Sequence, residues 1–140
     1  MLAVLSDPAR SPPFSPPGFI EAAQATGLAL LDRGEPGAAR AANLAYLRQR
    51  PAAAPFVAQA CTAIGDKGAA FSILDGYYFG IGQWSFTRPR GGDEDLQTRP
   101  LFQPPMKPMW SDPQFARLLS RIGLDDYWQK SGSVPDYRRA

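Results

Sequence analysis

The side chains that could carry chemistry gather mainly in one stretch of the chain, residues 80–110. Its arginines and aromatic residues lie near one another in the sequence: Trp84, Phe86, Arg88, Arg90, Arg99 and Phe102. Interleaved cations and rings can stack on nucleic acid or pair with an acidic peptide. Because 15 basic and 13 acidic residues leave a net charge of only +2, the charge does not favour nucleic acid. We therefore expect the rings to anchor this loop onto helices, and Trp84, Arg88 and Arg90 to be candidates for contact with a protein partner.

The remaining reactive groups do not form a catalytic or metal-binding pattern. The run Asp93-Glu94-Asp95 lacks the alternating ligand spacing of a calcium loop, so a solvated loop tip is expected. Asp112 is better explained as a helix cap than as half of an acid–base pair. The chain has no histidine and one cysteine, Cys61, which excludes zinc sites built from those ligands, an internal disulfide and a Ser-His-Asp triad. We predict no metal, no cofactor and no catalytic residue, and hence a protein that is not an enzyme.

The length and composition indicate one globular domain with long irregular parts. The chain has 140 residues, of which 44% are hydrophobic and 20% charged, as in ordinary folded proteins. Its 15 prolines and 13 glycines leave no room for continuous helix. The apolar run Leu2–Leu5 is too short for a signal peptide or a membrane span. We expect a soluble, cytoplasmic protein with no membrane contact, and the alternative is a periplasmic domain of a larger membrane regulator.

Four zones follow from the distribution of alanine and proline. Residues 1–18 form a leader in which residues 6–18 hold five prolines. Residues 19–82 are alanine-rich, with 17 of the 21 alanines between positions 22 and 70, and alanine favours helix. Residues 83–110 return to Pro, Gly and Arg and predict a long irregular loop. Residues 111–140 regain a helical pattern and are expected to form capping helices and a tail.

A repeat lies inside the alanine-rich zone. Gly34-Glu35-Pro36-Gly37-Ala38-Ala39-Arg40 recurs as Gly65-Asp66-Lys67-Gly68-Ala69-Ala70-Phe71, an offset of 31 residues. Apolar-periodic stretches precede each copy (19–31 and 56–64) and follow it (38–47 and 69–79). Each copy therefore predicts helix, tight turn and helix, with the first glycine in a left-handed conformation and an acidic residue beside the second helix's amino terminus.

This pattern resembles the tetratricopeptide repeat. In the first copy the signature positions fall on Gly27, Gly34, Ala39 and Pro51; in the second they fall on Ala58, Gly65, Ala70 and Gly82. The period of 31 is shorter than the family's 34, and Gly82 stands where a closing proline is expected, so an unrelated pair of alanine-rich hairpins is the alternative. The resemblance implies two antiparallel hairpins whose first helices present a concave, partner-binding surface. The side chains expected there are those of Gln24, Thr26, Gln59 and Thr62.

The carboxy-terminal zone resembles the closing segment of bacterial tetratricopeptide proteins. Ser111 or Asp112 can cap a helix that starts at Pro113 and stops at Gly123. A short second helix would carry Tyr127 and Trp128 onto the end of the array. Because two repeats are too few for a stable array, this tail replaces a third repeat, the chain belongs to a longer array, or a partner covers the bare end, for example in a homodimer.

These observations predict an all-α fold and a non-catalytic protein–protein interaction module. The module would bind a protein or peptide and could be the carboxy-terminal part of a bacterial regulatory or signalling protein. The alternative is a small-molecule-binding domain in which the loop is a lid. Its pocket would be lined by Tyr77, Tyr78, Trp84 and Trp110.

Overall fold

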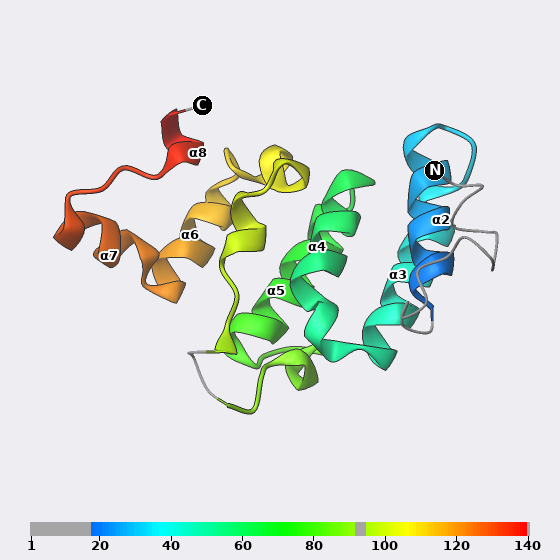
Figure 1. The fold of residues 1–140 in the computed structure, drawn as a ribbon, viewed down its shortest axis with the longest axis horizontal. Coiled ribbons are helices and arrows are strands. Elements are labelled where there is room, and N and C mark those ends of the chain that lie inside the picture. Colours follow the sequence, from blue (N-terminus) through cyan, green and yellow to red (C-terminus); the bar gives the residue numbers. More distant parts are fainter. Residues whose placement is uncertain (1–17, 92–94, 140) are drawn as a thin grey trace.

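The computed structural model describes residues 18–91 and 95–139, and within them all regular structure is helical, with no strand, as predicted (Figure 1). The α-helices are α2 Phe19–Leu30, α3 Pro36–Gln49, α4 Ala54–Ala63, α5 Lys67–Phe79, α6 Pro113–Ile122, α7 Leu124–Ser131 and α8 Asp136–Arg139. Short 3₁₀ segments lie at η1 Pro51–Ala53, η2 Ser85–Thr87, η4 Arg99–Phe102 and η5 Pro104–Met109. No helix in the described ranges has the length and apolar character needed to cross a membrane. The predicted leader, except Gly18, and the acidic residues Asp93 and Glu94 lie outside those ranges.

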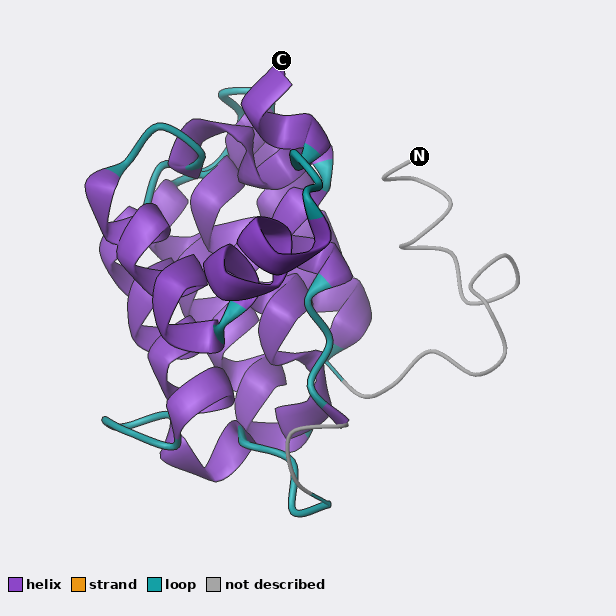
Figure 2. Cartoon of the chain, turned by 90° about the vertical axis from the view of Figure 1, so that its left-hand side faces the viewer, coloured by secondary structure: helices purple, strands orange, loops and turns teal. Residues whose placement is uncertain are grey.

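Two helical hairpins, α2–α3 and α4–α5, form the body of the molecule, and each pair packs together. Short turns at residues 31–35 and 64–66 reverse the chain, so both hairpins are antiparallel (Figure 1). Figure 2, which is turned so that the α6–α8 end faces the viewer, shows the helices packed side by side with the loops at their edges. The predicted order of helix, turn and helix in each copy is therefore confirmed.

The two turns differ in detail although their sequences match. In the second copy Gly65 is left-handed at φ +87°, and the Asp66 carboxylate accepts a hydrogen bond of 3.0 Å from the Ala69 N–H. In the first copy the left-handed residue is Asp32 at φ 55°, so the left-handed conformation predicted for Gly34 is wrong. Gly34 lies close to α2, since a Cβ there would lie 3.0 Å from the Leu28 Cβ, and a larger residue would require Leu28 to shift.

Small residues bring the helices close together at the centre. The signature alanines Ala39, Ala58 and Ala70 are completely buried. Ala58 and Ala70 share one hydrophobic core with larger side chains of α4 and α5, including Cys61, Ile73 and Leu74. The burial of alanine at these positions is what allows two helices of a hairpin to approach each other.

The described residues of the segment 83–110 contain 3₁₀ turns and are not simply a surface loop. Its prolines prevent a long α-helix but are compatible with the 3₁₀ turns η4 and η5, which pack against α4. Four of its apolar side chains are buried in the main core: Trp84, Leu101, Met106 and Met109. The Gln59 amide fastens the segment by donating to the Pro100 carbonyl at 2.8 Å and to the Gln103 Oε1 at 2.6 Å. The expectation that aromatic residues anchor this stretch is thus confirmed for Trp84, whereas Phe86 is 52% exposed.

The carboxy-terminal helices form where the sequence predicts them. The Asp112 carboxylate caps α6 by accepting a 2.8 Å hydrogen bond from the Gln114 N–H, and Gly123 ends this helix at φ +96°. Phe115, Leu118 and Leu119 on α6 reach the main core. On α7, Trp128 is partly buried against that core, whereas Tyr127 is 62% exposed.

Candidate functional site

An apolar groove lies between the first helices of the two hairpins, and we call it the α2–α4 groove. Its volume is about 340 Å³. Eleven residues line it: Phe19, Ala22, Ala23, Thr26, Gly27, Leu30, Asn43, Tyr46, Phe56, Val57 and Ala60. None of them is charged, so ion pairs with the walls cannot hold a ligand there.

Two polar side chains of this groove, Asn43 and Thr26, are hydrogen-bonded within the protein. The buried Asn43 amide donates to the Thr26 Oγ1 at 2.7 Å and to the Ala39 carbonyl at 2.8 Å. The Thr26 hydroxyl in turn donates to the Ala22 carbonyl at 2.7 Å. Buried polar groups paired in this way do not require a ligand. Recognition at this groove should therefore depend mainly on apolar contact, with the Tyr46 hydroxyl as the further polar group of the lining.

Aromatic side chains form the rim of the groove, and small residues form part of its wall. The Phe19 ring packs edge-on against the Tyr46 ring, with 6.0 Å between the centroids. Phe56 on α4 is 50% exposed, and Leu30 on α2 is 55% exposed. Large apolar side chains that stay half in water beside a groove are typical of binding surfaces.

The residues predicted to bind a partner lie mostly elsewhere. Only Thr26 of the four polar candidates lines the α2–α4 groove, and Gln24 is half-buried on α2 without lining it. Gln59 is held by segment 83–110, and the buried Thr62 hydroxyl donates to the Ala58 carbonyl at 2.8 Å. The structure therefore gives Gln59 and Thr62 contacts inside the chain.

The partner-binding residues predicted in the loop differ in how accessible they are. Trp84 is 3% exposed, so its ring is not accessible to a partner, and the Arg48 guanidinium lies 5.2 Å from its ring centroid. Arg88 is half-buried, whereas Arg90 is exposed. Sequence reasoning missed the groove residues Phe19 and Phe56. The signal that could have found Phe19 is the stripe of mainly apolar or small residues with helical spacing on α2 that starts at this residue.

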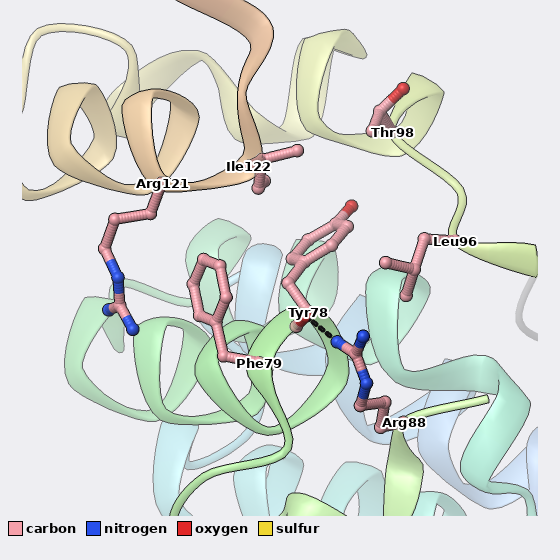
Figure 3. A pocket seen from close by; sticks show the side chains of 7 residues that line it. All are labelled: Tyr78, Phe79, Arg88, Leu96, Thr98, Arg121 and Ile122. Atoms are coloured by element: carbon pink, nitrogen blue, oxygen red, sulfur yellow. Dashed lines mark hydrogen bonds between the residues drawn. The ribbon is translucent and has the colours of Figure 1, made fainter. Parts of the chain in front are cut away.

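A second cavity, of about 470 Å³, lies between α5, α6 and the residues Arg88, Leu96 and Thr98 (Figure 3). Its lining residues are Tyr78, Phe79, Arg88, Leu96, Thr98, Arg121 and Ile122. Figure 3 shows Arg88 and Arg121 on either side of Tyr78 and Phe79. The Arg121 guanidinium carbon lies 3.9 Å from the Phe79 ring centroid, and the Arg88 guanidinium donates to the Tyr78 carbonyl. The cavity thus combines two cations with an aromatic wall.

The tyrosine of this cavity is not suited to proton transfer near neutral pH. The Tyr78 hydroxyl donates to the Gln97 carbonyl, and burial raises its pKa above the ordinary value of 10.0. The group therefore stays protonated and holds residues 97–98 against α5. The Tyr78 hydroxyl therefore has a structural role.

The ligand pocket predicted from Tyr77, Tyr78, Trp84 and Trp110 is not formed by these four residues together. Tyr77 and Trp84 are buried in the core, and Trp110 lies in an aromatic cluster at the carboxy-terminal end. Tyr78 alone of the four lines the cavity of Figure 3. The reason is close packing: the Tyr77 and Tyr78 ring centroids are 4.9 Å apart, and the Trp84 backbone lies directly on Gly76 of α5.

The chemistry-bearing groups of the core are inert or structural. Cys61 is completely buried, and burial together with the nearby Asp66 charge raises the pKa of its thiol to about 11. The hydrogen bond from the Ala69 N–H, helped by Arg40, lowers the pKa of the Asp66 carboxyl below 3.8. Among residues 18–91 and 95–139 no three Asp, Glu, Cys or His side chains gather in a way that could hold a metal ion.

Comparison with known protein families, with curated proteins and with solved structures finds no match to this chain. The fold and the surface chemistry must therefore carry the functional argument. What they establish is an all-helical domain with packed helix pairs, an uncharged groove between two of its helices, and a separate cavity with two arginines.

Proposed function

We propose that this protein is a non-catalytic interaction module of tetratricopeptide type, whose α2–α4 groove receives the apolar face of a partner protein's amphipathic helix. The observation that carries the proposal is the uncharged groove between the first helices of two successive hairpins. In helical repeats, partner-binding surfaces are built mostly from this helix of each repeat.

The family assignment within this proposal is supported by the repeat itself. Two hairpins follow each other in the chain, and the alanines at three signature positions are completely buried at the helix contacts. Gly27, a fourth signature position, lines the groove. A side chain larger than glycine there would narrow the groove, which connects the repeat signature with the binding surface.

A helix is the best partner for this groove for physical reasons. Small residues on the wall, such as Ala22, Ala23 and Ala60, let a second backbone approach closely. The half-exposed Phe56 and Leu30 can then close over aliphatic side chains of the partner at helical spacing. Because the lining carries no charge, affinity should depend little on salt concentration.

The test is a selection of amphipathic helical peptides of about 15 residues, long enough to hold helical structure, from a displayed library on the whole chain. We expect selected peptides to bind Phe56→Ala at least about tenfold more weakly than the wild type, as for a central aromatic contact. Phe86→Ala is the matched control, since Phe86 is equally exposed at 52% but does not line the groove. Peptides that bind both variants as well as the wild type would contradict the proposal.

A second candidate function rests on the cavity of Figure 3. The exposed Arg121 guanidinium, which lies on the Phe79 ring and 3.8 Å from the Asp75 carboxylate, suits a small organic anion with a flat apolar body. Under this alternative, the loop that carries Arg88, Leu96 and Thr98 is the lid over the ligand. Titration with 2-naphthoate, followed by NMR, should then move signals around Arg121 and lose affinity in Arg121→Gln but not in the control Arg117→Gln, whose side chain lies on the same helix outside this cavity. Equal responses of the two variants would refute it.

A further inference from the structure

A cluster of aromatic rings gathers at the carboxy-terminal end of the molecule. The Tyr137 ring is its centre, with its centroid 5.4 Å from that of Phe102, 5.9 Å from Trp110 and 6.1 Å from Trp128. These rings come from η4, from the end of η5, from α7 and from α8, so four separate segments of the chain meet here. Helices α6, α7 and α8 lie at one end of the molecule's long axis (Figure 1).

The cluster borders a cavity of about 560 Å³, which we call the terminal aromatic cavity. Eight residues line it: Thr98, Phe102, Trp110, Leu124, Tyr127, Trp128, Pro135 and Tyr137. Five are aromatic and none is charged. Tyr127 is 62% exposed, and Phe102, Trp110, Trp128 and Tyr137 are half-buried, so the rings are open to a ligand on one side and supported on the other.

This lining has the chemistry that recognises a polyproline II segment. Proline rings pack flat on aromatic faces, and the polyproline II backbone has no internal hydrogen bonds, so its carbonyls can accept from tyrosine O–H and tryptophan N–H groups. Tyr127 and Trp128 carry such donors beside the cavity. The Trp110 N–H is used internally, since it donates to the Leu101 carbonyl at 3.0 Å and so fixes that ring in place.

The chain itself contains a segment of the matching composition. Residues 10–17 read Arg-Ser-Pro-Pro-Phe-Ser-Pro-Pro, with two Pro-Pro pairs, and Pro13 and Pro16 have the P-x-x-P spacing of many proline-rich ligands. The segment lies outside the described residues. It joins the described part at Gly18, directly before α2, and α2 lies at the opposite end of the long axis from α6, α7 and α8 (Figure 1). A segment attached at one end of a molecule is best placed to meet this cavity on another molecule.

We propose that the terminal aromatic cavity binds the proline-rich segment Arg10–Pro17 of a second copy of this chain and so joins copies head to tail. Each copy then contributes one segment and uses one cavity, which is a heterologous contact that produces open chains or closed rings. The site is separate from the α2–α4 groove, because the two share no lining residue. This inference therefore does not depend on the function proposed above.

The test is sedimentation of the whole 140-residue chain between about 1 µM and 1 mM, the range that covers weak head-to-tail contacts. We expect the mean mass of the wild type to rise with concentration, and added synthetic peptide Arg10–Pro17 to return it to the monomer. Tyr127→Ala, at an exposed position, and the double variant Pro13→Ala/Pro16→Ala should each weaken association at least about fivefold, while Pro8→Ala, outside the segment, should not. A wild type that stays monomeric throughout would overturn the proposal.

A mixing experiment separates this contact from any other self-association. The Tyr127→Ala chain keeps its segment, and the Pro13→Ala/Pro16→Ala chain keeps its cavity, so an equimolar mixture should form heterodimers and stop there. Absence of heterodimers in the mixture would overturn the proposal. So would self-association that Phe56→Ala abolishes and Tyr127→Ala leaves intact, because the contact would then lie at the α2–α4 groove.

Discussion

Replacing Gly76 by alanine should destabilise this protein, although the same change elsewhere in its helices should not. Gly76 lies inside α5, where glycine is normally less favourable than alanine by up to about 1 kcal/mol. A Cβ at this position would lie 2.4 Å from the Trp84 carbonyl oxygen and 2.5 Å from the Trp84 carbonyl carbon. Normal contact begins about 1 Å further away, so segment 83–110 would have to shift off α5. Overpacking of this kind costs about 1–3 kcal/mol, which exceeds the gain in helix propensity.

Thermal and urea unfolding followed by circular dichroism measure this effect directly. For a chain of this size, a loss of 1–2 kcal/mol lowers Tm by roughly 3–8 °C. Gly68→Ala in the same helix is the matched control, because the nearest atom to its added Cβ lies 3.8 Å away; Gly37→Ala in α3 meets nothing within 4 Å. Both controls should melt at or slightly above the wild type. A Gly76→Ala protein as stable as these controls would refute the packing of Trp84 on α5.

Three further predictions concern the groups that hold the core and the segment 83–110. Burial raises the pKa of the Cys61 thiol from 9.0 to about 11, so the thiol ionises first in the unfolded chain. The free energy of unfolding should therefore fall by up to about 3 kcal/mol between pH 9 and pH 11. Urea unfolding curves of Cys61→Ala should lack this part of the decline. Asp66→Ala should lower the free energy of unfolding by about 1 kcal/mol at pH 7, since it removes the cap of α5. Because the pKa of this carboxyl is lowered, its contribution is present above pH 4 and is lost as the pH falls through the folded value. The free energies of wild type and variant should therefore become equal in acid, and a difference that stays constant with pH would contradict the assignment. Gln59→Met should remove the hydrogen bonds to Pro100 and Gln103 and speed amide exchange in residues 99–109 but not in α2 and α3. Exchange in residues 99–109 that is as slow in the variant as in the wild type would show that Gln59 does not hold the segment.

The repeat and the caps made the helical part of the fold predictable from local chemistry. Gly65 and Asp66 end one helix and begin the next, and Asp112 and Gly123 bound α6, where the sequence placed these features. The matching Gly34 misled, because the chain uses Asp32 for the left-handed turn. The similarity of the two turn sequences therefore predicted the hairpin but not which residue adopts the left-handed conformation.

The packing of distant segments against each other could not be predicted from local sequence patterns. Nothing in the proline-rich spacing of residues 99–109 indicates that these turns lie on α4, because the contact depends on Met106 and Met109 filling space that the alanines of α4 leave open. These turns also contact Gln59, which donates to the Pro100 carbonyl, and Thr62, whose hydroxyl lies 2.9 Å from the Met109 sulfur. The α2–α4 groove was not predicted for a related reason: polar residues were expected to mark a binding surface, whereas the aromatic residues Phe19, Tyr46 and Phe56 line the groove.

The central claim, that a partner helix binds in the α2–α4 groove, is tested most directly by NMR of the isotope-labelled chain during titration with a selected helical peptide. The claim predicts that the shifted amides cluster around Ala23, Gly27 and Ala60, with little change near Tyr127 or Arg121. Shifts that cluster instead at the terminal aromatic cavity, or at the two-arginine cavity of Figure 3, would contradict it and would place the binding surface there.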